Sequence, residues 1–347
     1  NGGQPGWLSR LAVRRAVRWR DATAEDMSAA IAAARNAFDT TDWSRDHAFR
    51  ARCLRQLRDA LLAHGDELRE LTIAEVGCPS FLTHGPQFEG PVTDLGYFAD
   101  LAESYEWTRD LGTAKPMGLK NHRELRSEAV GVVGAITPWN FPHQINFAKI
   151  GPALAAGCTV VLKPAPDTPW CAALVGKVVA EETDFPPGVL NIVTSTDHQL
   201  GAQLSTDPRV DLVSFTGGLV TGRVIAREAA ATVKKVALEL GGKNPNVVFA
   251  DACATDDLLA AAVDNALNAA FLPAMMLSGF VFDLRNVPVV IQVVSNVLPA
   301  THFMGLIKTL FMAGDYWPQI LRANLTLAAY AAVLILMATR TLTKKLD

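Results

Sequence analysis

Apolar and polar positions follow two different periods along the chain. From Thr23 to about Leu111, apolar residues recur three and four positions apart, which predicts amphipathic helices. In "TAEDMSAAIAAARNAF", Thr23 is a candidate capping residue, and Glu25 and Asp26 suit the first turn of a helix. Gly65 predicts a break between two further helices, and another helix is expected over "PVTDLGYFADLAESYEW".

The pattern changes at Val130. Short β-branched runs now alternate with helix-length stretches, and the runs read "VGVVGAIT", "CTVVLKP", "VLNIVT", "DLVSFTG", "KKVALEL" and "NVVFAD". Continuous apolar strands separated by helices predict an α/β fold with a Rossmann-like parallel sheet and helices on both faces. Ligands bind beyond the carboxyl ends of such strands, so the residues that close each strand are the candidates for chemistry.

Residues 271–347 differ in composition from the rest. They hold six basic and three acidic side chains and no glutamate, whereas residues 1–270 hold 26 basic and 32 acidic ones. The uncharged run Leu325–Thr339 is short for a membrane span of ~20 residues, but Arg340, Lys344 and Lys345 follow it. We expect an all-α, membrane-type segment with membrane contact through 320–340; a buried amphipathic helix pair is the alternative.

Charge and cysteine content narrow the function classes. A net charge of −3 and a pI near 6.2 give no reason to expect nucleic-acid binding. Five scattered cysteines and seven histidines form no metal-binding spacing, so we expect reduced thiols, no metal site and a cytoplasmic location for residues 1–270.

Residues 1–20 are Arg-rich but lack a signal peptide's apolar region. They stay unassigned, with a transit segment, a frayed helix and an expression scar as alternatives.

Four strand-closing segments carry candidate chemistry: "ITPWNFP", "KPAPDTP", "FTGGLVTG" and "ELGGK". Gly217 and Gly218 open a helix whose free backbone N–H groups suit an anion such as a pyrophosphate. Lys163 could reach a ribose hydroxyl or a phosphate oxygen. Glu239 could act as a general base above a cofactor. Each feature alone also fits an ordinary turn or a solvated strand end.

Together, these motifs make residues 21–270 resemble the aldehyde dehydrogenase family. "TPWNFP", "AAGCTVVLKPA", "FPPGVLNIV", "SFTG" and "LELGGK" occur in the family's order. The resemblance implies NAD or NADP as cofactor, bound without a GxGxxG fingerprint, and oxidation of a small aldehyde to a carboxylic acid. It makes Asn140 the oxyanion donor and Glu239 the general base. The implied cofactor-binding residues are Ile136, Thr137, Pro138, Trp139, Lys163, Gly188, Phe215, Thr216, Gly217, Gly218, Leu240 and Gly241.

The sequence departs from the family pattern at two cofactor positions. Gly218 stands where the family usually has a hydroxyl, so weaker phosphate binding is expected. Pro166 stands where a ribose-binding Glu is common, three residues after Lys163, which leaves the choice between NAD and NADP open.

The family's nucleophilic cysteine has no counterpart at the expected distance from Glu239. That distance leads to Leu272–Met276, "LPAMM", and no cysteine follows Cys253. Cys253 is not expected to substitute: Asp256 and Asp257 would raise its pKa, although the N-terminus of the helix that follows would lower it. The sequence therefore predicts a cofactor-binding lobe that is inactive as written. Most of the family's oligomerisation segments are also missing, which puts a homo-oligomer in doubt.

Residues 271–347 are similar to the end of ABC-2 type transporter permeases, through "LPAMMLSGFVF" and a final helix with basic residues. The alternative function is therefore a membrane-transport fragment that carries a soluble dinucleotide-binding passenger. Two resemblances that meet near residue 271 suggest a fused or misassembled reading frame. The expected domains are 1–20, 21–270 and 271–347.

Overall fold

The structure is a computed structural model that describes residues 21–242, positions 255, 257, 258, 260, 261, 301 and 302, and helix 317–341. By its internal contacts the chain divides into two units: Asn1–Val76 with Ser80–Gly242, and Gly77–Pro79 with Lys243–Asp347. The Arg-rich segment 1–20, Cys253, the predicted strand "NVVFAD" and most of 271–347 lie outside the described residues. The predicted domain borders therefore stay predictions.

The first unit begins with the helices that the apolar periodicity predicts. They are α2 (Ala24–Thr40), α3 (His47–Ala63), α4 (Gly65–Val76), α5 (Ser80–Thr83) and α6 (Glu89–Ser104), with a short 3-10 turn at Asp42–Ser44. Thr23 caps α2 in a reciprocal box, since its Oγ1 accepts from Asp26 N at 3.2 Å and Asp26 Oδ2 accepts from Thr23 N at 2.9 Å. The predicted cap and the break at Gly65 are confirmed.

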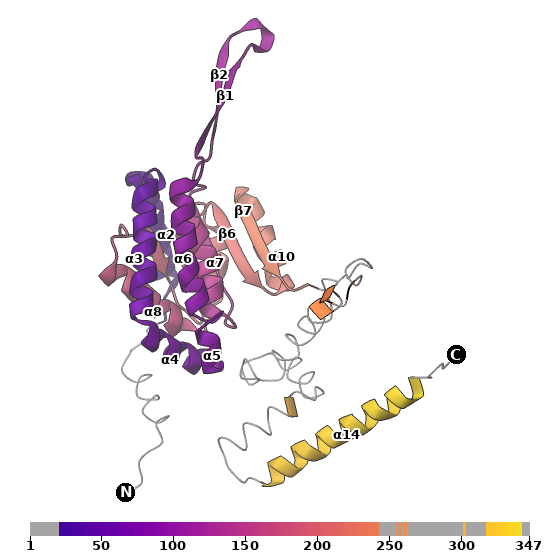
Figure 1. Cartoon of the computed structure of the whole chain (residues 1–347). Coiled ribbons are helices and arrows are strands. Elements are labelled where there is room, and N and C mark those ends of the chain that lie inside the picture. Colours follow the sequence, from indigo (N-terminus) through magenta and orange to yellow (C-terminus); the bar gives the residue numbers. More distant parts are fainter. Residues whose placement is uncertain are drawn as a thin grey trace. The chain divides into compact units, whose positions relative to one another are not determined.

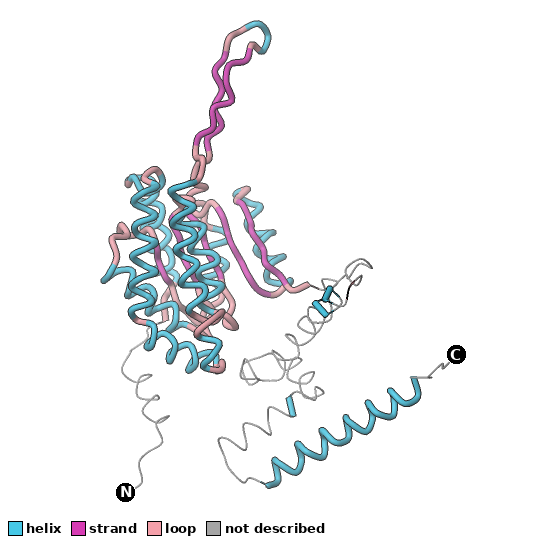
Figure 2. The backbone as a smooth tube through the Cα atoms, viewed as in Figure 1, coloured by secondary structure: helices cyan, strands magenta, loops and turns pink. Residues whose placement is uncertain are grey.

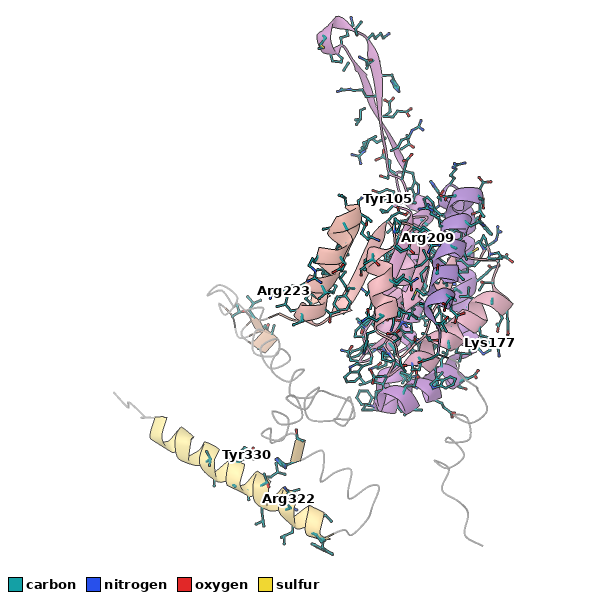
Figure 3. The ribbon with its side chains drawn as sticks, turned by 180° about the vertical axis from the view of Figure 1, so that it is seen from behind. Tyr105, Lys177, Arg209, Arg223, Arg322 and Tyr330 are labelled. Atoms are coloured by element: carbon teal, nitrogen blue, oxygen red, sulfur yellow. The ribbon has the colours of Figure 1, made fainter. Side chains whose placement is uncertain are left out.

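An antiparallel hairpin follows α6, where the sequence predicts helix as far as Leu111. Strands β1 (Thr108–Ala114) and β2 (Asn121–Arg126) pair with each other and project away from the body of the unit (Figures 1 and 2). Aromatic rings anchor its base, where Tyr105 and Trp107 meet edge to face at 4.9 Å (Figure 3). The hairpin's side chains are mostly exposed, and its few apolar residues, such as Leu111 and Leu125, do not alternate with polar ones along a strand.

The second half of the unit is a five-stranded parallel sheet. Its strands are β3 (Val132–Ile136), β4 (Thr159–Lys163), β5 (Leu190–Ile192), β6 (Leu212–Gly217) and β7 (Lys235–Leu240), and they lie in the order β5-β4-β3-β6-β7. The connecting helices are α7 (Pro142–Ala155), α8 (Pro169–Glu182), α9 (Gln199–Thr206) and α10 (Leu219–Ala229). The predicted α/β fold with a Rossmann-like parallel sheet is confirmed.

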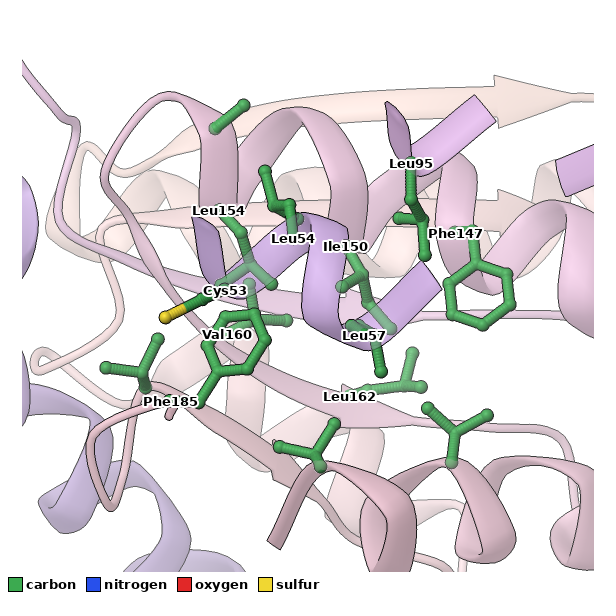
Figure 4. Close-up of a cluster of buried hydrophobic side chains, with 14 of the residues drawn as sticks. Cys53, Leu54, Leu57, Leu95, Phe147, Ile150, Leu154, Val160, Leu162 and Phe185 are labelled. Carbon is green, nitrogen blue, oxygen red and sulfur yellow. The ribbon is translucent and has the colours of Figure 1, made fainter. Parts of the chain in front are cut away.

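Helices cover both faces of this sheet. On one face, called the α7 face, α7 and α8 pack on the strands and α3 and α6 pack against these helices; Figure 4 shows the buried cluster between them, from Leu54 and Leu95 to Val160 and Leu162. On the other, called the α9 face, α2, α9 and α10 enclose a second cluster that includes Ile31, Val161 and Phe215. The strand residues therefore alternate between two buried layers, as the continuous apolar runs predict.

In the second unit the structure describes one long helix, α14 (Trp317–Thr341). It contains the apolar run Leu325–Thr339 and also Arg322, which Figure 3 labels together with Tyr330. Among the described residues, no helix has both the length and the apolar character needed to cross a membrane. The predicted membrane-type segment thus gains no support from the part of the chain that the structure describes.

Candidate functional site at the carboxyl edge of the sheet

The strand order creates a switch point between β3 and β6. The chain leaves β3 into α7 on one face of the sheet and leaves β6 into α10 on the other face (Figure 1). The register sets Ile136 beside both Lys163 and Phe215, and Thr216 beside Glu239. Neighbouring connections that diverge at a switch point open a crevice at the carboxyl edge, which is where such sheets bind ligands.

Lys163 lies at this edge on the α9 face. Its side chain is 3% exposed, and its Nζ donates to the backbone carbonyl of Ser195 at 3.2 Å. An ammonium has three N–H donors, and the described residues accept only this one. Burial lowers the pKa of Lys163, whereas the nearby carboxylates of Asp197 and Asp21 raise it. Lys163 therefore keeps donors for a polar ligand.

The loop that accepts from Lys163 is held by the segment before α2. Ala22 N donates to the carbonyl of Thr194 at 3.1 Å, and Ser195 Oγ donates to the carbonyl of Ala22 at 2.9 Å. The carboxylate of Asp21 accepts from the backbone N of Thr196 at 3.1 Å and also from its hydroxyl. These bonds fix the Ser195 carbonyl in place, and the sequence alone gives no sign of them.

The glycine turn after β6 leads into the N-terminus of α10. Gly217 lies on the ring of Phe215, because a Cβ at this position would approach Phe215 Cζ to 2.5 Å. Gly218 is the N-cap residue of α10, no side chain caps the helix there, and a Cβ at Gly218 would have no atom within 4 Å. The N-terminus of α10 thus has no side-chain cap, and space is open along the Cβ direction of its N-cap residue; backbone N–H groups at such a helix end suit an anion.

Asn140 lies on the opposite side of the edge, just before α7. Its backbone carbonyl accepts from Nε2 of Gln87 at 2.9 Å, and Gln87 is fully buried. The side-chain Oδ1 of Asn140 is buried without a hydrogen-bond partner in the described part of the chain. Gln87 precedes Asn140 by 53 residues and belongs to no motif, so sequence analysis could not connect the two.

Lys149 joins Glu239 on the α7 face. Lys149 is 8% exposed, and its Nζ donates to Oγ of Ser214 at 3.0 Å, with Ser214 on the strand next to β7. Burial lowers the pKa of Lys149 and the nearby carboxylate of Glu239 raises it. Glu239 itself is exposed. Sequence analysis missed Lys149; its only signal is that it is the one charged residue of the α7 sequence besides a histidine.

Comparisons with known proteins now decide the family. The sequence model of the aldehyde dehydrogenase family matches residues 12–274. The chain belongs to the aldehyde dehydrogenase family. It is 40% identical over 255 residues to a betaine aldehyde dehydrogenase of Bacillus subtilis, covering 72% of this chain and 49% of that protein. It is 43% identical over 227 residues to a mitochondrial succinate-semialdehyde dehydrogenase of Arabidopsis thaliana, covering 64% and 41%.

Solved structures agree with this assignment. The NAD+ complex of an aldehyde dehydrogenase from Bacillus cereus superposes with a TM-score of 0.64 at 36% identity, over 72% of this chain and 48% of that one. An NAD-dependent aldehyde dehydrogenase from Sinorhizobium meliloti gives a TM-score of 0.62 at 39% identity, over 68% and 46%. The chain spans about half the length of the aldehyde dehydrogenases that it matches.

Three of the predicted cofactor residues have their side chains engaged or placed elsewhere. Thr137 is buried and donates its hydroxyl to Oδ1 of Asn146 at 2.7 Å. Leu240 packs against α10, with its Cδ2 2.7 Å from the Cβ position of Gly222. Gly188 precedes β5 at the amino edge of the sheet, and its positive φ and its contact with the Ala33 carbonyl explain the glycine. Gly188 therefore belongs to the packing of α2.

The remaining predicted residues gather at the carboxyl edge but on two faces. Ile136, Lys163 and Phe215 lie on the α9 face, while Asn140 and Glu239 lie on the α7 side. Half-buried Pro138 and Trp139 follow β3, Thr216 and Gly217 end β6, and Gly218 and Gly241 directly follow β6 and β7. Among the described residues, no three His, Cys, Asp or Glu side chains gather as metal ligands would.

Proposed function

We propose that residues 21–242 form the NAD(P)-binding lobe of an aldehyde dehydrogenase-type oxidoreductase, which converts an aldehyde to a carboxylic acid. The observation that carries the proposal is the pairing of a buried lysine with an uncapped helix N-terminus at the carboxyl edge, beside the switch point. A cation and a set of free backbone N–H groups suit the ribose and the pyrophosphate of a dinucleotide. The relatives solved with NAD+ support the same cofactor.

In this proposal, residues on the two faces of the sheet bind different parts of the cofactor. Lys163 would hold the adenosine ribose on the α9 face, and the turn at Gly217 and Gly218 would hold the pyrophosphate at the start of α10. The nicotinamide would then lie toward Asn140 and Glu239. Space for a Cβ at Gly218 and the unpaired Oδ1 of Asn140 are the local features that fit an additional molecule at this edge.

Asn140 and Glu239 would act on the aldehyde. The side-chain amide of Asn140 would donate to the oxygen on which negative charge develops, an interaction that contributes about 3–4 kcal/mol in comparable oxyanion sites. Glu239 would accept a proton as general base, and its exposure leaves it open to water or a nucleophile. Bound NAD(P)+ would supply the hydride acceptor.

The nucleophile is the part that these 347 residues do not offer in the family's position. Leu272–Met276 reads "LPAMM", and no cysteine follows Cys253 in the sequence. Family chemistry needs a thiolate to attack the aldehyde carbonyl. We therefore propose that this polypeptide binds the cofactor without oxidising aldehydes, and the identity of any aldehyde substrate stays open.

Calorimetric titration of the 347-residue chain with NAD+ and NADP+ tests the cofactor site, and absorbance of NADH with a panel of aldehydes tests turnover. We expect saturable binding at one site per chain and no NADH formation. Absence of binding by either cofactor at millimolar concentration would contradict the proposed lobe. Rapid NADH formation would contradict only the proposed lack of turnover.

The alternative prediction, a permease fragment with a soluble passenger, rests on residues 271–347. The family match ends at residue 274, and no described helix is suited to a membrane span. We therefore propose only the dehydrogenase-type function. Among the described residues, Cys53, Cys78 and Cys158 are free and buried, which supports a reducing environment for residues 21–242.

A further inference from the structure

We propose that Asp197 supplies the carboxylate that binds the adenosine ribose and that this site therefore prefers NAD to NADP. The inference rests on the proposed function, since it concerns the same cofactor site. In many dinucleotide sites an acidic side chain accepts a hydrogen bond from the ribose 2′-hydroxyl and excludes a 2′-phosphate. Here the residue three positions after Lys163 is Pro166, which has no such group.

Asp197 lies next to Lys163 through the loop that Lys163 contacts. The Nζ of Lys163 donates to the carbonyl of Ser195, and the backbone N of Asp197 donates to Oγ of Ser195 at 3.2 Å. Asp197 is thus two residues along the chain from Ser195, whose carbonyl accepts the hydrogen bond from Lys163. Its carboxylate also acts electrostatically on Lys163. Since Lys163 lies on the α9 face at the carboxyl edge, Asp197 lies at the same end of the sheet.

One oxygen of the Asp197 carboxylate is occupied and the other is available. Oδ1 accepts from the backbone N of Gln199 at 2.8 Å, which fixes the side chain at the start of α9. For Oδ2 the described residues offer no hydrogen-bond partner, and no ion pair within 4.0 Å joins Asp197 to a described cation. Asp197 is exposed, so Oδ2 can accept from a ligand hydroxyl.

The other nearby carboxylate does not compete for this role. Asp21 acts on Lys163 as well, but its two oxygens already accept from the backbone N and the hydroxyl of Thr196. Asp21 therefore holds the loop, whereas Asp197 faces outward from it. The carboxylates of Asp21 and Asp197 would both repel the 2′-phosphate of NADP.

The balance of charge favours a ribose without a phosphate. The charged groups that act on Lys163 are both carboxylates, so one ammonium faces two negative charges. A 2′-phosphate would add about −1.5 to −2 charges, as monoester phosphates carry near pH 7. NADP sites usually meet that charge with an arginine. The ribose diol of NAD instead offers donors that Asp197 can accept.

Dissociation constants for NAD+ and NADP+, measured by calorimetry on the 347-residue chain and two variants, test the inference. The variants are Asp197→Asn, which keeps Oδ1 for Gln199, and the matched control Asp167→Asn. Asp167 is an exposed acid on the loop after β4, and it is not among the charges that act on Lys163. Far-UV circular dichroism and the urea midpoint check that each variant is folded.

We expect the unchanged chain to bind NAD+ at least about tenfold more tightly than NADP+, and Asp197→Asn to reduce that ratio to about threefold or less. Asp167→Asn should leave the ratio unchanged. Equal affinity of the unchanged chain for both cofactors would overturn the preference while leaving the proposed lobe intact. A ratio that falls with Asp167→Asn and not with Asp197→Asn would move the role to Asp167. Binding of neither cofactor would instead reject the proposed function.

Discussion

Two buried lysines lie on opposite faces of the sheet and differ in what surrounds them. Lys163, on the α9 face, donates to a backbone carbonyl in a loop that is tied down by Asp21 and Ala22. Lys149, on the α7 face, donates to the hydroxyl of Ser214, and the carboxylate near it is exposed Glu239. Lys163 is thus bonded to a fixed loop, whereas Lys149 has an exposed carboxylate nearby.

The difference between the two lysines suits cofactor binding on one face of the sheet and proton transfer on the other. Burial lowers the pKa of both lysines, and nearby carboxylates raise it in both, so their electrostatics are alike. Only the geometry of the partners differs. A ligand that needs a fixed donor would be bound on the α9 face, whereas proton transfer needs the exposed group on the α7 face.

The largest expected effect comes from exchanging each lysine for methionine, which keeps the apolar stem. Lys163→Met should weaken NAD+ binding by about tenfold to a hundredfold, because a hydrogen bond from a charged group contributes ~1.5–3 kcal/mol. Lys149→Met should change it by no more than about threefold. Calorimetric titration measures both. An equal loss of NAD+ affinity in the two variants would contradict the proposal that the cofactor is bound on the α9 face.

His143 extends the comparison, because it is a buried titratable group on the α7 side. Its Nε2 lies 3.0 Å from Thr72 Oγ1, and burial lowers its pKa from 6.5 to about 3. The unfolded chain therefore takes up a proton below pH 6.5 that the folded chain does not, and stability falls as pH drops from 6.5 towards 3. The cost at pH 5 is about 2 kcal/mol.

Urea unfolding of His143→Leu at pH 7 and pH 5 measures this cost. The leucine variant should lose about 2 kcal/mol less between the two pH values than the unchanged chain does. The control is His198→Gln, since His198 is exposed and adjoins α9. If His143→Leu and the unchanged chain show the same dependence on pH, His143 is not neutral in the folded state.

A smaller effect is expected where β6 passes into α10. Gly218→Ser should tighten NAD+ binding about threefold, because an added hydroxyl can donate to a phosphate and one such bond contributes ~1 kcal/mol. The open space around the Gly218 Cβ position allows the substitution. Gly217→Ser is the matched control and should weaken binding, since its Cβ would lie 2.5 Å from the Phe215 ring. A tighter Gly217→Ser variant would contradict this account of the turn.

The smallest effect is a pair of crossed titrations. Glu239→Gln should lower the pKa of Lys149 and leave that of Lys163 unchanged, because Glu239 raises only the former. Asp197→Asn should lower the pKa of Lys163 alone. NMR titration of the lysine side chains follows both. A variant that shifts the pKa values of both lysines would show that the charges on the two faces interact.

The strands and helices were largely predictable, because their signals are local. Thr23, Gly65 and the glycines after β6 mark ends of elements by their own backbone chemistry, and each apolar run from Val130 onward became a strand wherever the structure describes it. The β1–β2 hairpin was not predictable. Both sides of it are exposed, and its few apolar residues do not recur at every second position, so no period of two distinguishes the strands.

The site was predictable only as far as motifs extend. The motifs identify Lys163, Asn140 and Glu239 at strand ends, but they do not tell which face each side chain occupies. Gly188 was grouped with them by family motif, although it lies at the amino end of β5. Gln87 and Lys149 were missed because their roles depend on contacts made 53 and 65 residues away in sequence.

A structure of the 347-residue chain determined with NAD+ tests the central claim most directly. The account predicts the adenosine ribose beside Lys163 and Asp197, the pyrophosphate over Gly217 and Gly218, and the nicotinamide toward Asn140 and Glu239. A dinucleotide bound at the amino edge of the sheet, or away from the β3–β6 switch point, would contradict it.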